Sequence, residues 1–157
     1  MKSIGVSGLA VMLGVSVAFA QPNHAVNEAA APSYLYTMSA KSGQFANGRL
    51  SLKDVPAVVY FSDRPYRLSG TLNVDAFDRQ WDRGRDSFKL DPPNATLSVL
   101  GADGADNIVV ELSDPQVAAQ EDGISFKVRV LRGELPESFG TSALFIDMQF
   151  GSSPIDP

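Results

Sequence analysis

The chain has 157 residues, of which 18 are acidic, 13 are basic, one is histidine and none is cysteine. Its net charge of −5 repels phosphate backbones, so nucleic acid is not an expected partner. Without cysteine there are no disulfides, thiol nucleophiles or thiolate metal sites, and a secreted domain of this kind must be held together by packing.

Residues 1–20 have the pattern of a secretory signal peptide. Lys2 supplies a short positive start, residues 4–17 are apolar, and residues 18–20 are Ala-Phe-Ala, a small-residue cleavage pattern. An N-terminal membrane anchor is the alternative, but the apolar stretch is short and rich in glycine. We therefore expect a secreted or periplasmic protein that begins at Gln21 after cleavage and has no further membrane span.

The rest of the chain is long enough for one domain with a real core. Residues 21–32 are small, polar and bounded by prolines, which predicts a disordered leader. Residues 33–151 are the expected folded domain, and residues 152–157 are a C-terminal tail.

From residue 33 onward, apolar residues alternate with polar ones, the period of a half-buried strand. Residues 124–130 (ISFKVRV) are the clearest case, with four apolar side chains on one face. Short strands separated by polar turns, among them turns predicted at Ser42-Gly43 and Asp114-Pro115, favour an all-β fold, either a β-sandwich or a small barrel. Our first expectation is a single β-sandwich, immunoglobulin-like or a related Greek key. About eight strands are predicted: 33–38, 49–53, 58–62, 66–72, 95–100, 108–112, 124–130 and 142–150.

One segment, residues 73–83, breaks this period. Val74, Phe77 and Trp81 follow the spacing of one helical face, and Asn73 is a good N-cap residue. We expect a short helix there, packed across one end of the sandwich.

Several chemistries are excluded by what the folded part lacks. The single histidine, His24, lies in the expected leader, so no Ser-His-Asp or Cys-His arrangement and no histidine-based zinc site can be built. Residues 101–107 contain Asp103, Asp106 and Asn107, too few oxygens for Ca²⁺ and sufficiently explained as a hairpin turn. No metal, no cofactor and no catalytic residue is therefore assigned.

Aspartates and arginines gather in residues 63–86, which hold five of each. One interpretation is a solvated helix and loops with weak ion pairs. The other is a polar pocket where arginines bind an anionic or sugar ligand. Tyr34 and Tyr36 lie on the same face of a predicted strand, which also leaves two interpretations. If that face is buried they belong to the core, and if it is exposed they form a platform on which sugar rings could stack.

Residues 58–67, VVYFSDRPYR, end a strand in a charged turn. Asp63 can bond to its own downstream backbone and Pro65 forces Arg64 to be extended, so a tight turn is enough to explain the stretch. A turn does not require one aspartate and two arginines together, however. We therefore predict Asp63, Arg64 and Arg67 as ligand-binding residues.

The stretch FSDRPYR, followed by Gly70, by Phe77 and Trp81, and by DSFKLDPPNATLSVL (residues 86–100), resembles a family of uncharacterised secreted bacterial β-rich proteins with a YFSDRP…DPPNA pattern. The resemblance covers about residues 34–147. It implies secretion and one compact domain. That family has no known activity, so no catalytic or binding residue is carried over.

The leading hypothesis is a non-enzymatic, secreted or periplasmic protein that binds an unknown small anion, glycan or envelope protein through the charged turn. A first alternative is a carboxylate-dependent hydrolase of envelope polysaccharide, which needs two Asp or Glu residues flanking a cleft. A second is an envelope adhesion or structural protein, whose sign would be an exposed apolar patch or an unpaired edge strand.

Overall fold

The computed structural model describes residues 32–84, 87–102, 104–118 and 122–150. Residues 148–150 are described by their backbone only. The predicted signal peptide and tail, and the leader up to residue 31, lie outside the described residues. The elements are β1 (Ser33–Ala40), β2 (Ser42–Ala46), β3 (Arg49–Lys53), β4 (Val58–Ser62), β5 (Ser69–Leu72), α1 (Val74–Trp81), β6 (Asn94–Gly101), β7 (Gly104–Ala118), β8 (Gly123–Arg132), β9 (Ser138–Phe139) and β10 (Ser142–Phe150).

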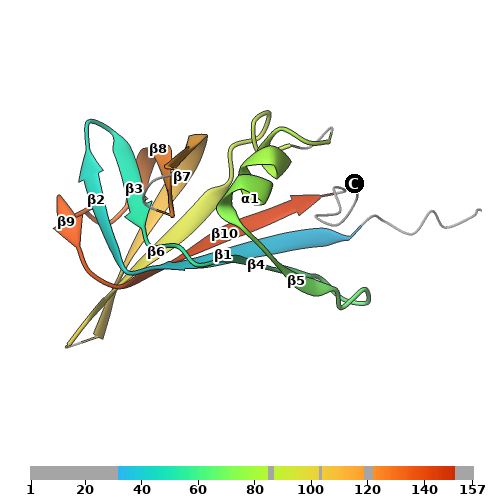
Figure 1. Ribbon diagram of the computed structural model, residues 1–157, viewed down its shortest axis with the longest axis horizontal. Helices are drawn as coiled ribbons and strands as arrows, with labels where there is room; N and C mark the ends of the chain where they lie inside the picture. Colours follow the sequence, from blue (N-terminus) through green and yellow to red (C-terminus); the bar gives the residue numbers. More distant parts are fainter. Residues whose placement is uncertain (1–31, 85–86, 103, 119–121, 151–157) are drawn as a thin grey trace, which may run out of the picture.

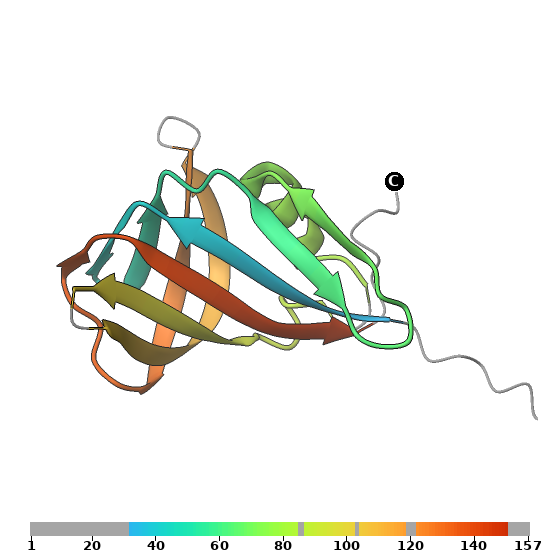
Figure 2. The ribbon, with the colours of Figure 1, turned by 90° about the horizontal axis from the view of Figure 1, so that it is seen from below.

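All these strands belong to one antiparallel sheet, in the order β5-β4-β1-β10-β6-β7-β8-β3-β2-β9. The sheet is strongly curled: β2, β3, β7 and β8 bend toward the side of β1 and β10 on which α1 lies (Figure 1). Figure 2 shows β4, β1, β10 and β6 side by side. The predicted all-β fold with one short helix is confirmed, and the strands that face each other across the core are parts of one continuous sheet.

The core lies on the concave face and is built by the predicted alternation. Inward residues of β7 and β8 such as Val110 and Phe126 are fully buried, whereas Val130, expected on the same face, is 39% exposed near the end of β8. In the described residues no helix has the length and apolar character needed to cross a membrane. The largest fully buried side chains are Tyr34, Tyr36, Phe77, Phe126, Met38, Leu50, Leu52, Leu97, Leu112, Ile124, Leu144 and Ile146.

Helix α1 begins where the sequence predicts. The Asn73 side chain accepts a hydrogen bond from the backbone N–H of Ala76 at 2.8 Å, an N-cap that satisfies one of the free N–H groups of the first turn. The Phe77 ring lies 5.3 Å from that of Tyr36 on β1, and the Trp81 ring lies 5.6 Å from that of Phe126 on β8. The helix therefore joins two distant parts of the sheet through its apolar face.

Two strands were not predicted, β2 and β9. Ser42 and Gly43 were expected to form a turn, which was wrong: they begin β2, where Gly43 pairs with Phe139 of β9. Asp114 and Pro115 were also expected to form a turn, but they lie inside the long strand β7, at an irregularity between Ser113 and Gln116. Such an irregularity, a β-bulge, turns the strand locally without ending it.

Candidate functional site

The predicted charged turn is part of a corner, residues 61–68, that joins the end of β4 to β5. The Asp63 N–H donates to the Ser33 carbonyl at 3.1 Å, and the Ser33 N–H donates to Asp63 Oδ1 at 3.2 Å. Two residues that form a hydrogen-bonded pair in an antiparallel ladder normally exchange two backbone N–H to C=O hydrogen bonds. Here one of the two is of that kind, and in the other the Asp63 carboxylate accepts in place of its backbone carbonyl. Its bond goes to the start of β1, and not to the downstream backbone as expected from the sequence.

The rest of the corner is closed by its own hydrogen bonds. The Ser62 N–H donates to the Leu68 carbonyl at 2.8 Å, and the Leu68 N–H donates to Ser62 Oγ at 2.7 Å. The Arg67 N–H donates to the Asp63 carbonyl at 3.3 Å, and Arg67 itself has a positive φ of 54°. The backbone of the corner is therefore well supported.

The predicted site residues Asp63, Arg64 and Arg67 are brought together in this corner, and all three are exposed. Within the described residues, neither arginine forms an ion pair with Asp63 or with α1. Asp63 thus has a structural partner, while the guanidinium groups face solvent. Ligand binding here stays a prediction.

A second place collects functional groups that sequence reasoning had not combined. Between α1 and the bulge of β7 lies a hollow of about 400 Å³, called the α1–β7 hollow below. Its lining combines three carboxylates, one ammonium group and two large aromatic rings. The residues are Asp78, Trp81, Asp82, Phe88, Lys89, Ser113, Asp114 and Pro115.

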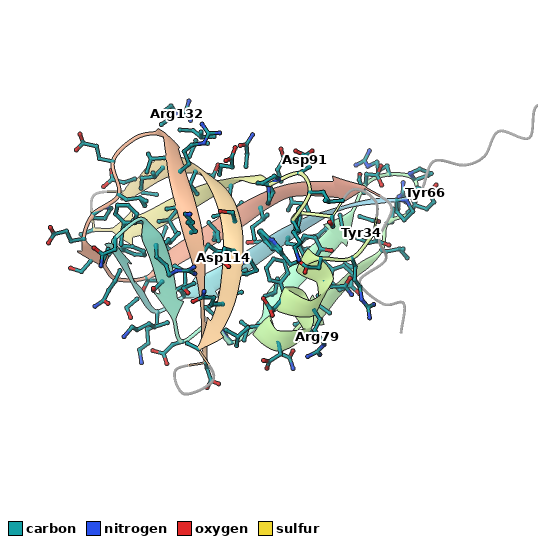
Figure 3. The ribbon with its side chains drawn as sticks, turned by 90° about the horizontal axis from the view of Figure 1, so that it is seen from above. Tyr34, Tyr66, Arg79, Asp91, Asp114 and Arg132 are labelled. Atoms are coloured by element: carbon teal, nitrogen blue, oxygen red, sulfur yellow. The ribbon has the colours of Figure 1, made fainter. Side chains whose placement is uncertain are left out.

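The β7 side of the hollow is set by the bulge. Asp114 has a positive φ of 49°, within the irregular stretch of the strand. Arg49 of β3 donates to the Asp114 carbonyl at 3.0 Å and to Ser125 Oγ at 3.2 Å, and it forms an ion pair with the Asp114 carboxylate. One arginine thus holds both the backbone and the side chain of the bulge residue. Figure 3 shows Asp114 and, on the helix, Arg79.

The α1 side carries the other two carboxylates. Lys89 pairs with Asp82 at 2.6 Å, and the Phe88 ring lies 5.0 Å from the Trp81 ring. Burial raises the pKa of Asp78, and the neighbouring carboxylates of Asp82 and Asp75 raise it further. Within the described residues no group donates a hydrogen bond to the Asp78 carboxylate, so it is the carboxylate of the hollow that is open to a ligand.

Sequence reasoning could have found part of this hollow. Asp78, Trp81 and Asp82 are spaced i, i+3 and i+4, which places them on neighbouring parts of the helix surface. Nothing in the sequence links Asp114 to them, since the sheet has to fold before β7 meets α1.

Two further hollows, of about 440 and 600 Å³, share Leu135 at another part of the sheet. Their linings include carboxylates, such as Asp106, Glu134 and Glu137, but no lysine or arginine. Only one ring, Phe45, contributes. They therefore lack the mixture of charges and rings that marks the α1–β7 hollow.

Tyr34 and Tyr36 are fully buried, so they belong to the core and cannot form the exposed stacking platform. In the part of the chain that the structure describes, no group of three or more His, Cys, Asp or Glu side chains is arranged to hold a metal ion. In comparisons with protein-family models, curated proteins and solved structures, nothing matches this chain. The resemblance to secreted β-rich proteins stays a prediction, and the site must be interpreted from its own chemistry.

Proposed function

We propose that this is a secreted or periplasmic, non-enzymatic binding protein that holds a small organic cation in the α1–β7 hollow. The observation that carries the proposal is the convergence of three carboxylates and two aromatic rings on one concave surface. Ligand sites are typically concave, with a few convergent polar groups among apolar ones. The proposed location rests on the signal-peptide pattern of residues 1–20.

The charges within the hollow favour a cation. Lys89 forms an ion pair with Asp82, and Arg49 forms one with Asp114, whereas Asp78 forms none among the described residues. The nearby Arg79 lowers the pKa of Asp78, but less than burial and the carboxylates of Asp82 and Asp75 raise it. An ammonium or guanidinium group of a ligand would supply the direct positive partner that Asp78 lacks. Trp81 and Phe88 are only 2% and 3% exposed, so they add a small apolar surface to the lining beside these carboxylates.

The protein provides its own reporter for this test. Trp81 lines the hollow and is the single tryptophan of the chain, so intrinsic fluorescence comes from the proposed site. We expect a saturable fluorescence change on titration with organic cations such as putrescine, agmatine or arginine amide. The neutral diol of the same length as putrescine should give none.

Variants locate the binding. Asp78→Asn should remove the response, whereas Asp106→Asn, which neutralises an exposed aspartate of β7 outside this hollow, should keep it. Binding should also strengthen as the pH rises through the raised pKa of Asp78, because the cation binds the charged carboxylate. An equal response to the neutral diol, or no response to any organic cation, would count against the proposal.

A second candidate, the carboxylate-dependent hydrolase of envelope polysaccharide, is favoured by one observation. The raised pKa of Asp78 keeps its carboxyl protonated to a higher pH than usual, as a general acid requires, and Asp82 and Asp114 line the same hollow. The test is the release of new reducing ends from purified peptidoglycan and other envelope polysaccharides. Release that disappears in both Asp78→Asn and Asp114→Asn would favour hydrolysis over simple binding.

A further inference from the structure

The corner presents two arginines and two apolar side chains to solvent. Arg64 and Arg67 are exposed and form no ion pair within the described residues, in a chain whose net charge is −5. Beside them, Phe61 is 47% exposed and Leu68 is 39% exposed. Two cations are therefore flanked by two apolar side chains that face water.

This surface is held in shape before any partner arrives. Asp63 ties the corner to Ser33 by two hydrogen bonds, and the bonds between Ser62 and Leu68 close its base. Figure 3 shows Tyr66 at one end of the molecule, well separated from the labelled Asp114. A preformed, projecting surface loses little conformational entropy when it docks.

We propose that the corner docks the protein on a membrane surface that carries anionic lipid headgroups. Arg64 and Arg67 would bind phosphates at the headgroup level, since guanidinium groups match phosphate geometry. Phe61 and Leu68 would enter the boundary between headgroups and acyl chains, as apolar residues of interfacial anchors do. Tyr66, which is half-buried in the corner, suits the same level because its ring is apolar and its tip polar.

The apolar pair favours a bilayer over a soluble anion. A free phosphate would use Arg64 and Arg67 but leave Phe61 and Leu68 in water, whereas a membrane interface takes up both kinds of side chain. Asp63 reduces the local positive charge, although its Oδ1 accepts a hydrogen bond from the Ser33 N–H. Because the chain as a whole is acidic, an anionic surface repels its other faces and leaves this end to make contact.

This docking goes beyond the binding of a cation in the α1–β7 hollow and does not depend on it. Each arginine close to an anionic membrane surface raises partitioning roughly five-fold. Removal of both should therefore lower partitioning roughly 25-fold. Because one small anchor binds only reversibly, we expect weak association that falls with added salt.

The test is co-sedimentation of residues 21–157, the whole chain after the predicted signal peptide, with vesicles of phosphatidylcholine, alone or mixed with phosphatidylglycerol. We expect binding to the mixed vesicles only, a roughly 25-fold loss in Arg64→Ala/Arg67→Ala, and a clear loss in Phe61→Ser/Leu68→Ser. The matched control is Leu131→Ser/Arg132→Ala, which removes an exposed leucine and an exposed arginine from β8. Arg132 lies far from Tyr66 in Figure 3, so this control should bind as the unchanged chain does.

Three results of the vesicle experiment would overturn the proposal, provided that circular dichroism shows each variant to be folded. They are equal binding to both kinds of vesicle, binding that survives the loss of both corner arginines, and an equal loss in the Leu131/Arg132 control. Titration with inorganic phosphate distinguishes a site for a free phosphate ion from a site for a lipid headgroup. If phosphate shifts the NMR signals of the corner while vesicles do not bind, the corner is a site for a free anion and the membrane proposal is wrong.

Discussion

The ring of Tyr60 covers Gly70, its direct partner across β4 and β5. A Cβ atom placed on Gly70 would lie 2.3 Å from the Tyr60 hydroxyl oxygen and 2.6 Å from the ring carbon that carries it. The Tyr60 ring can therefore occupy this position only because residue 70 has no side chain. Tyr60 also packs edge-on against Tyr34, with 5.8 Å between the ring centres. A glycine at the edge of the sheet is covered by an aromatic ring from the neighbouring strand.

Gly70→Ala should displace Tyr60 and lower the free energy of unfolding by about 1–3 kcal/mol, the usual cost of overpacking a closely packed region. Urea denaturation measures the loss. Gly140→Ala is the control, since a Cβ there would meet no atom within 4 Å and should change stability little. Equal effects of the two substitutions would show that the contact with Tyr60 is not what requires glycine.

The Tyr36 side chain leads to a second prediction. It is fully buried, and its hydroxyl has no hydrogen-bond partner among the described residues. A buried polar group without a partner costs roughly 1–3 kcal/mol, so Tyr36→Phe should raise the free energy of unfolding by about 1 kcal/mol. Tyr60→Phe should have a smaller effect, because its hydroxyl is not among the buried groups that lack a partner. A destabilised Tyr36→Phe variant would indicate a bound partner for the hydroxyl.

The same residue predicts how stability depends on alkaline pH. Burial strongly raises the pKa of Tyr36, and the neighbouring hydroxyls of Tyr34 and Tyr60 add to the rise. The folded state therefore keeps this proton at a pH where the unfolded chain, with tyrosine pKa values near about 10, loses it. The stability that the folded state gains by keeping Tyr36 protonated is fully present below about pH 10 and is lost progressively as the pH rises above that value. Urea midpoints measured from about pH 9 to 12 should fall less in Tyr36→Phe than in the unchanged chain.

The parts of the fold that the sequence predicts depend on neighbours in the chain. Alternation within β8 and the spacing of Val74, Phe77 and Trp81 are local patterns, and both elements form where these patterns place them. The exposed end of β8 is the exception, because Val130 lies near the end of its strand, where less of the molecule covers it.

What escaped prediction depends on contacts between distant residues. Strand β2 contains Gly43, and a Cβ there would lie 2.2 Å from the ring of Phe139, so this glycine serves a strand pairing and not a turn. Asp63 finds its partner in Ser33, thirty residues earlier. The α1–β7 hollow is likewise formed only when the bulge at Asp114 meets the helix. Each of these features requires the sheet to be folded.

The last prediction concerns Arg49, which holds the β7 bulge from β3. Its guanidinium bonds to the Asp114 carbonyl, the Asp114 carboxylate and Ser125 Oγ, a forked arrangement that lysine cannot reproduce. Arg49→Ala and Arg49→Lys should both loosen the wall of the α1–β7 hollow. We expect a loss of about 1 kcal/mol in stability, together with weaker cation binding in the Trp81 fluorescence titration.

The control for Arg49 is Arg129→Ala. Arg129 also binds a carboxylate across neighbouring strands, that of Glu111, but neither residue lines the α1–β7 hollow. Its removal should leave cation binding unchanged, because the Arg129–Glu111 pair contacts neither Asp114 nor the lining of the hollow. If Arg49→Ala loses stability but keeps full cation binding, the bulge does not shape the ligand site. If both arginine variants weaken binding equally, the effect is a general one of charge and the assigned role of Arg49 is wrong.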